Sequence, residues 1–90
     1  MRRAAKIDEV QPSIVEALRK VGASVVSLAS IGQGCPDLLA CKGDRLWLIE
    51  VKGPKGTLTD DQKRFILNWS GTVHIIRTPD EALKLVGEIE

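Results

Sequence analysis

Two apolar runs of strand length flank a short polar segment around Gly43 in the middle of the chain. The first run covers residues 37–41 and the second covers residues 45–51. Gly43 at the first central position favours a two-residue type II′ turn, because that position needs a positive φ angle. This turn sets Lys42 opposite Arg45 and thereby fixes the register of the other pairs. The pattern therefore predicts a β-hairpin.

The rest of the pattern predicts helices and further strands around this hairpin. Apolar residues recur at helical spacing in residues 7–21, and Pro12, which is best tolerated in a first turn, indicates that the regular helix begins near it. Thr59 and Thr78 each begin a capping box, which marks the start of a helix. The predicted elements are helix 7–21, strand 24–29, strands 37–41 and 45–51, helix 60–69, strand 73–76 and helix 79–89.

These elements predict an α/β fold with a four-stranded mixed sheet flanked by helices, in the order α-β-β-β-α-β-α. The first three strands can pair antiparallel, whereas the strand–helix–strand unit over residues 45–76 predicts a parallel crossover. The helix within this unit is expected to bury Phe65, Ile66 and Trp69. Trp47 and Trp69 are predicted to lie either in the core or at a dimer contact.

The composition fits a single folded domain over residues 1–90. A chain of 90 residues leaves little surplus burial, so a partner subunit is plausible. An apolar surface, through the last helix or Trp69, is expected to recruit a second copy. The net charge of +1 argues neither for nor against nucleic acid. With 3% aromatic residues and no tyrosine, wide base-stacking platforms are not expected.

Nothing in the sequence points to export or to membrane insertion. No apolar run approaches the roughly 20 residues of a membrane span, and the N-terminus lacks the hydrophobic region of a signal peptide. Cys35 and Cys41 form no CxxC motif and have no histidine at ligand spacing, which indicates reduced thiols. These features predict a cytoplasmic protein. The single histidine, His74, lies in an apolar run and is expected to be a strand residue and not a catalyst.

The hairpin register places two carboxylates, Asp37 and Glu50, directly opposite each other at the open end. Directly opposed residues have Cβ atoms roughly 4.5–5.5 Å apart, and like charges at that distance are destabilising. Lys52 lies two residues beyond Glu50 and points to the same face. A divalent cation would give this cluster a function, because Mg²⁺ is usually held by one or two carboxylates with waters and substrate phosphates. The alternative is that Asp37 serves in a turn and Glu50 and Lys52 lie on a solvated strand edge.

The residues around this cluster resemble the PD-(D/E)xK nuclease signature, in the form found in the VRR-Nuc family. The matching elements are a Gly-x-Pro-Asp segment, a Glu-Val-Lys strand end and a following helix that bears Gln, here residues 34–37, 50–52 and 58–62. Residues 11–26 and Ser30 also resemble archaeal Holliday-junction resolvases. The resemblance implies a restriction-endonuclease-like fold and Mg²⁺- or Mn²⁺-dependent phosphodiester cleavage. For short stand-alone members it further implies a homodimer that acts on branched DNA such as four-way junctions.

The resemblance implies roles for individual residues. Asp37 and Glu50 would bind Mg²⁺ together with the backbone carbonyl of Val51, and Lys52 would position the attacking water or stabilise developing negative charge. Cys35, beside them, is expected to be a small filler and not a nucleophile. Candidate DNA contacts are Ser30, Gln62, Lys55, Lys63 and Arg64, together with the N-terminal arm that carries Arg2, Arg3 and Lys6.

One position departs from the resolvase pattern. These resolvases carry a glutamate in the first helix that helps to organise the metal, and the equivalent slot here holds Gln11. Glu9 and Glu16 are further candidates for that role. Gln62 likewise has two interpretations, as a phosphate contact or as a simple capping-box partner.

Four functions therefore remain open. The first is an endonuclease that is selective for branched DNA, and the intact set of Asp37, Glu50 and Lys52 favours it. The second is a non-catalytic nucleic-acid-binding module, which the departure at Gln11 and the modest charge favour. The third is a nuclease on linear duplex or single-stranded DNA, and the fourth is a protein-interaction subunit.

Overall fold

The computed structural model describes residues 9–90 and contains the predicted order of elements. In this part of the chain they are α1 (Gln11–Lys20), β1 (Ser24–Ser27), β2 (Leu38–Lys42), β3 (Arg45–Val51), α2 (Asp60–Asn68), β4 (Val73–Ile76) and α3 (Pro79–Leu85). The strands form one sheet in the order β1-β2-β3-β4. β1, β2 and β3 pair antiparallel, and β4 pairs with β3 in parallel. The predicted α/β class with a four-stranded mixed sheet is therefore confirmed.

The central hairpin has the predicted register. Lys42 pairs with Arg45 beside the turn, and Leu38 pairs with Ile49 at the other end of the ladder. Gly43 has a φ angle of 65°, and Asp44 has no positive φ, which is the combination that a type II′ turn requires. A local turn signal has thus fixed a long-range pairing.

Two strand boundaries differ from the prediction. β2 begins one residue later than predicted because Asp37 accepts the Val51 N–H with its side-chain Oδ2, at 2.7 Å, outside the regular ladder. β1 is shorter than predicted and ends at Ser27, whose hydroxyl accepts the backbone N–H of Ala29 at 3.2 Å and so begins a turn.

The helix boundaries follow proline and glycine. α1 begins at Gln11 with Pro12 in its first turn, as the proline indicated, and the part of the predicted helix before residue 9 lies outside the described residues. α3 ends at Leu85 and does not continue to residue 89, because Gly87 adopts a left-handed φ of 83°. Within residues 9–90, no helix combines the length and the apolar character needed to cross a bilayer.

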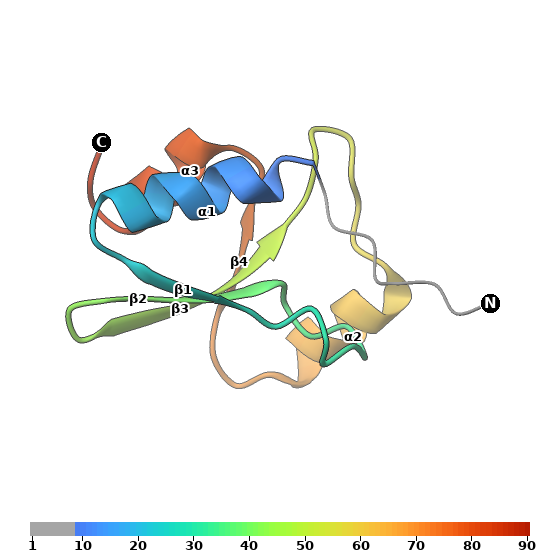
Figure 1. Ribbon diagram of the computed structural model, residues 1–90. Coiled ribbons are helices and arrows are strands. Elements are labelled where there is room, and N and C mark those ends of the chain that lie inside the picture. The colour runs from blue at the N-terminus through green and yellow to red at the C-terminus, as the bar shows by residue number, and fades with distance from the viewer. Residues whose placement is uncertain (1–8) are drawn as a thin grey trace.

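One face of the sheet carries the hydrophobic core. α1 and α3 lie together against this face (Figure 1). Trp47 takes a core position here, and the Arg45 guanidinium lies 4.9 Å from the centroid of its ring. The buried core residues are Ile14, Leu18, Ala23, Val25, Leu38, Ala40, Trp47, Ile49, Val51, Ile76, Ala82 and Val86.

α2 lies on the other side of the sheet, near the loop that precedes β2 (Figure 1). The prediction that this helix buries Phe65, Ile66 and Trp69 was wrong. It has no buried residue; Phe65 and Ile66 are half-buried, and Trp69 is 47% exposed. The reason is that α2 packs against the loop, where a Cβ on Gly34 would overlap the backbone of Asp61, instead of lying across the strands.

This second sheet face is apolar and only partly covered. Val26 pairs with Leu39, and Leu39 pairs with Leu48, so these three residues share the face opposite the core. Val26 is 53% exposed, and on the same face Leu46 is 67% exposed and Ile75 is 39% exposed. Contiguous exposed apolar patches mark interaction surfaces, whereas single exposed apolar residues are common on any protein.

His74 lies in β4, as predicted for a strand residue, and partial burial lowers its pKa. In the unfolded chain this histidine takes up a proton near pH 6.5. In the folded chain it takes up the proton only at a lower pH, because burial disfavours the charged form. The unfolded state therefore binds more protons as the pH falls, and stability declines below about pH 6.5. We expect the urea-unfolding midpoint to fall between pH 7 and pH 5, and the fall to be smaller in His74→Gln. An equal fall in both proteins would contradict this assignment.

Candidate functional site

The open end of the hairpin brings Asp37 to the end of β3. Its backbone carbonyl accepts the N–H of Leu28 at 2.8 Å, and its side-chain Oδ2 accepts the N–H of Val51 at 2.7 Å. The preceding residue, Pro36, is fully buried, so the backbone at this position is held on both sides. The Asp37 carboxylate is thereby fixed next to the residue that follows Glu50.

Glu50 is the most buried ionisable group of the cluster. It is 2% exposed, its Oε2 accepts a hydrogen bond from Gln62 Nε2 at 3.0 Å, and Lys52 Nζ lies 3.7 Å from the same oxygen. Lys52 is 9% exposed, and its backbone N–H donates to the carbonyl of Ile76 at 3.1 Å. A carboxylate and an ammonium group are therefore held together with little contact with water. Removing either partner from such a pair leaves a buried charge and costs several kcal/mol.

The Cys35 thiol responds to both carboxylates. Burial raises its pKa, and the negative charges of Glu50 and Asp37 raise it further. Both carboxylates therefore lie close enough to this thiol to influence it. The thiol is also kept protonated, which agrees with the expectation of a small filler at this position. Cys35 and Cys41 are both free, as predicted.

Gln62 joins α2 to the site. Its Oε1 accepts the backbone N–H of Thr59 at 2.9 Å, while its backbone N–H donates to the Thr59 hydroxyl at 3.2 Å. The predicted capping box is therefore confirmed. The remaining Nε2 group points to Glu50, which is a third role that neither sequence interpretation included. The fold does not test a phosphate contact by Gln62, so that role stays a prediction.

Gln11 offers a buried oxygen at the same end of the sheet. Gln11 and Ser27 line the same cavity. Ser27 pairs with Leu38, and Leu38 pairs with Ile49 near the end of β3. This pairing places the cavity at the end of the sheet where Glu50 lies. Gln11 is 6% exposed, and its Oε1 is buried without a hydrogen-bond partner among residues 9–90. Such an atom is costly unless a partner such as an ion or water satisfies it.

The two alternative first-helix acids are less suitable. Glu9 is exposed, and Glu16 is exposed and lies 4.0 Å from Lys20. In the described part of the chain, histidine, cysteine, aspartate and glutamate side chains form no group of three or more that could hold a metal ion. Two carboxylates and an unsatisfied amide oxygen nevertheless suit Mg²⁺, which takes oxygen ligands and usually keeps several waters.

Arg77 is a structural contributor to the site that sequence reasoning missed. Its Nη1 donates to the carbonyls of Gly53 and Gly56, at 2.6 Å and 2.9 Å, and so closes the loop that follows Lys52. The contact links residues more than twenty positions apart. An arginine after an apolar strand carries no local signal for such a role, so only the fold identifies it.

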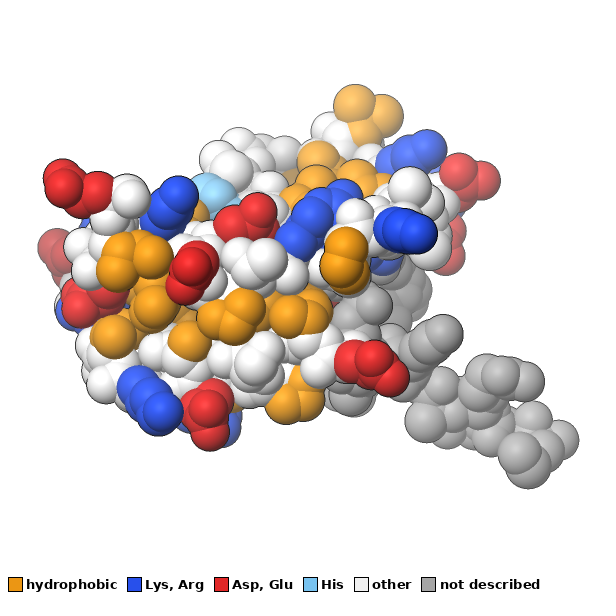
Figure 2. Space-filling model, turned by 90° about the horizontal axis from the view of Figure 1, so that it is seen from above, with side chains coloured by type: hydrophobic (Ala, Val, Ile, Leu, Met, Phe, Trp, Pro, Cys, Tyr) orange, Lys and Arg blue, Asp and Glu red, His pale blue; other side chains and the backbone are white. Residues whose placement is uncertain are grey.

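The remaining candidate DNA contacts are not part of the carboxylate cluster. Ser30, Lys55, Lys63 and Arg64 are all exposed, and Arg64 donates to Asp61 at 2.9 Å. Arg2, Arg3 and Lys6 lie outside the described residues. Figure 2 looks onto the layer of α1 and α3 and shows acidic and basic side chains interspersed across it. Among residues 9–90, that face offers no continuous basic surface to a DNA backbone.

Comparisons with known proteins agree with this architecture. The sequence profile of the VRR-NUC domain matches residues 4–72. A solved structure described as a VRR_NUC domain is similar to the chain with a TM-score of 0.71 and 24% sequence identity, covering 90% of this chain and 94% of that chain. No match is found among curated proteins. At this identity, the solved structure supports the fold alone.

Proposed function

Because the chain belongs to the VRR-NUC family, a family of nuclease domains, we propose that it is a metal-dependent endonuclease that hydrolyses phosphodiester bonds in branched DNA. The observation that carries the proposal is the convergence of Asp37, Glu50 and Lys52 at the end of β3. A buried acid paired with a buried lysine is costly to maintain, and a surface strand edge has no need of it. A catalytic role accounts for this cost.

The donor set fits a divalent cation, with Mg²⁺ as the first choice and Mn²⁺ as a substitute. Asp37, Glu50, the Val51 carbonyl and Gln11 Oε1 are the residues that would hold it. When bound, such an ion polarises the scissile phosphate and lowers the pKa of a bound water.

The chain's own residues supply orientation and charge. Lys52, which is buried, places a positive charge where negative charge develops on the phosphate oxygens. Gln62 restrains the Glu50 carboxylate from α2. The bond from Val51 N–H to Asp37 restrains the other carboxylate, so both acids are oriented before substrate binds. Preorganisation of this kind lowers the barrier because little reorganisation is left for the reaction itself.

DNA binding is assigned to the exposed cations and polar groups on the α2 side. Lys55 follows β3, and Lys63 and Arg64 lie on α2 with Gln62. Ser30 lies in the loop against which α2 packs. Each phosphate contact by a lysine or arginine adds affinity that salt reduces.

A second copy of the chain is proposed to cover the exposed sheet face. The face is apolar at Val26, Leu39 and Leu48, and α2 leaves much of it exposed. Burial of such a face against itself gives a twofold dimer. Two symmetrically placed sites would then be available for two strands of a four-way junction.

We expect the protein to sediment as a dimer at tens of micromolar, and Val26→Lys to shift it to the monomer. Val26 lies on the edge strand β1, and a charged side chain buried there in an apolar interface loses its hydration without gaining a partner. Thr57→Lys, which adds the same side chain to an exposed loop, serves as the control. A wild-type protein that sediments as a monomer would exclude this dimer.

The cleavage assay compares labelled four-way junctions, linear duplexes and single strands of the same sequence, with Mg²⁺, Mn²⁺ or EDTA. The proposal expects metal-dependent nicking that is fastest on the junction. Faster cleavage of linear duplexes or single strands would favour the linear-DNA alternative. Tight binding without nicking would favour a non-catalytic module, for which the glutamine at position 11 is the supporting observation.

Gln11→Glu is expected to lower the half-saturating Mg²⁺ concentration about tenfold, because an added carboxylate ligand binds the ion more tightly. Without metal, the same variant should be less stable than the wild type, since its buried charge lacks a partner. Thermal unfolding with and without Mg²⁺ measures this difference. Glu9→Gln at the exposed neighbouring acid is the matched control. A change in Mg²⁺ dependence caused by Glu9→Gln alone would assign the ligand to Glu9 instead.

A further inference from the structure

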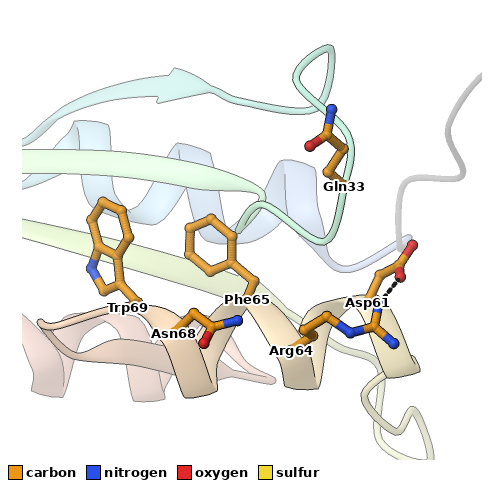
Figure 3. Close-up of a pocket in the computed structure, with 6 residues that line it drawn as sticks. All are labelled: Gln33, Asp61, Arg64, Phe65, Asn68 and Trp69. Atoms are coloured by element: carbon orange, nitrogen blue, oxygen red, sulfur yellow. Dashed lines mark hydrogen bonds and ion pairs between the residues drawn. The ribbon is translucent and has the colours of Figure 1, made fainter.

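A cavity separate from the carboxylate cluster lies between α2 and the loop that precedes β2. Its volume is about 430 Å³, within the range of small-ligand sites. Figure 3 shows Gln33 on the loop at one side and side chains of α2 and its C-terminal end at the other. The lining residues are Gln33, Asp61, Arg64, Phe65, Asn68 and Trp69.

An aromatic pair forms the apolar part of this cavity. The rings of Phe65 and Trp69 stack with centroids 5.2 Å apart and an interplanar angle of 20°. Stacking covers one face of the indole, yet Trp69 remains 47% exposed. The indole is therefore held in a defined orientation while a large part of it faces solvent. Every nucleobase has a planar face that can stack on such a ring.

Polar groups surround the aromatic pair. The side-chain amides of Gln33 and Asn68 each provide donors and an acceptor, and neither makes a hydrogen bond within residues 9–90. Arg64 is oriented by its bond to Asp61 at 2.9 Å. Both residues are exposed, so their planar amides are open to the donors and acceptors at the edge of a base, whereas a purely apolar partner that covered them would leave them unsatisfied.

The backbone of the loop is strained in a way that maintains this cavity. Gln33 has a left-handed φ of 59°, between Gly32 at 72° and Gly34 at 78°. A glutamine in this region is unfavourable and persists only where its surroundings enforce it. The close approach of Gly34 to the backbone of Asp61 and Gln62 supplies that enforcement. The loop therefore presents Gln33 across the cavity from α2 (Figure 3).

We propose that this cavity binds one unpaired nucleobase of the DNA substrate, stacked on Trp69 and contacted at its edge by Gln33 and Asn68. The inference rests on the proposed nuclease function and adds a basis for substrate selection. Bases within an intact duplex are already stacked and cannot enter, whereas bases at a branch point or in a single strand can. The site takes one base, so it is compatible with the low aromatic content of the chain.

The distance along α2 connects this cavity to the carboxylate cluster. Gln62, which bonds Glu50, and Trp69 are separated by seven residues of sequence. Gln62 lies in the first turn of α2 and Trp69 directly follows its last turn, so Trp69 and the carboxylate cluster lie at opposite ends of one short helix of about 14 Å. The bound base is therefore expected within a few nucleotides of the cleaved bond.

The test uses Asp37→Asn, so that binding is measured without cleavage. Fluorescence anisotropy compares a short labelled single strand with the same strand made abasic and with a paired duplex of equal length. The base-containing strand is expected to bind about fivefold to a hundredfold more tightly than the abasic strand. Trp69→Ala and Asn68→Ala should each reduce that preference. Leu67→Ala, at an exposed neighbour that does not line the cavity, should leave it unchanged.

Three results would overturn the inference. They are equal affinity for the base-containing and abasic strands, a Leu67→Ala effect as large as that of Trp69→Ala, and a change from dimer to monomer caused by Trp69→Ala. The last result would show that a second copy occupies the cavity. Failure of the nuclease proposal is a separate outcome. A wild-type protein that binds unpaired bases through Trp69 but cleaves no DNA would support the base-binding site and refute the nuclease function.

Discussion

Asp37→Asn is expected to reduce phosphodiester cleavage by about a thousandfold or more while leaving the fold intact. A thousandfold loss corresponds to about 4 kcal/mol, which is the scale of charge stabilisation attributed to a bound metal ion. The asparagine side-chain oxygen can still accept the Val51 N–H, so the end of β3 should keep its position. Only the negative charge is removed. Single-turnover cleavage at high Mg²⁺ measures the rate, and urea unfolding measures the stability.

Asp44→Asn provides the matched control for this experiment. Asp44 lies in the turn at the opposite end of the same hairpin and is exposed. The chemical change is identical, but Asp44 is not part of the carboxylate cluster formed by Asp37, Glu50 and Lys52. We expect Asp44→Asn to retain wild-type cleavage within about twofold, as surface substitutions away from special features usually have small effects. Equal loss in both variants, or full activity in Asp37→Asn, would refute the assignment of Asp37 to the active site.

Gly34→Ala is expected to destabilise the protein by about 2–5 kcal/mol, the sum of a left-handed alanine and an overpacked contact. A Cβ at this position would lie 2.8 Å from the Gln62 nitrogen and closer still to the Asp61 carbonyl group. These are backbone atoms, so the first turn of α2 would have to move. Gln62 would then be displaced from Glu50, and we expect cleavage by the remaining folded protein to fall about tenfold, as for a lost hydrogen bond to a charged group.

Gly32→Ala separates the two causes. Gly32 lies in the same loop with a similar φ of 72°, but a Cβ there would meet no atom within 4 Å. Its alanine variant should therefore show only the conformational cost, about 1–2 kcal/mol. Urea unfolding of both variants isolates the contact between the loop and α2. If Gly32→Ala and Gly34→Ala lose the same stability and the same activity, that contact does not position Gln62.

The hairpin and the site at its open end could be predicted because their signals are local. A single glycine at the turn fixes which residues face each other, and the register then brings Asp37 to the end of β3 beside Glu50. Threonine caps likewise mark where α2 and α3 begin. These features depend on residues a few positions apart, and no knowledge of the tertiary structure is required to read them.

The placement of α2 could not be predicted in the same way. Phe65 and Trp69 have the spacing of a buried helical face, but the spacing does not say whether a partner surface exists. In the fold, α2 rests on the loop before β2, so the two rings stack on each other and remain accessible. The choice between Glu9 and Gln11 was undetermined for a related reason. Glu9 has the carboxylate that a metal site prefers, but Glu9 is exposed, whereas Gln11 is buried. The sequence does not show which of the two side chains is buried.

Arg77 and β4 belong to the smallest part of the chain that is expected to fold on its own. The recognisable nuclease motif is complete by Gln62, yet β3 relies on later residues for its outer hydrogen bonds, including the one from Lys52 N–H to Ile76. Without them β3 would become an unprotected sheet edge, prone to pairing with other chains. A shortened gene product that retains every motif residue but ends before β4, at Val73, is therefore expected to aggregate.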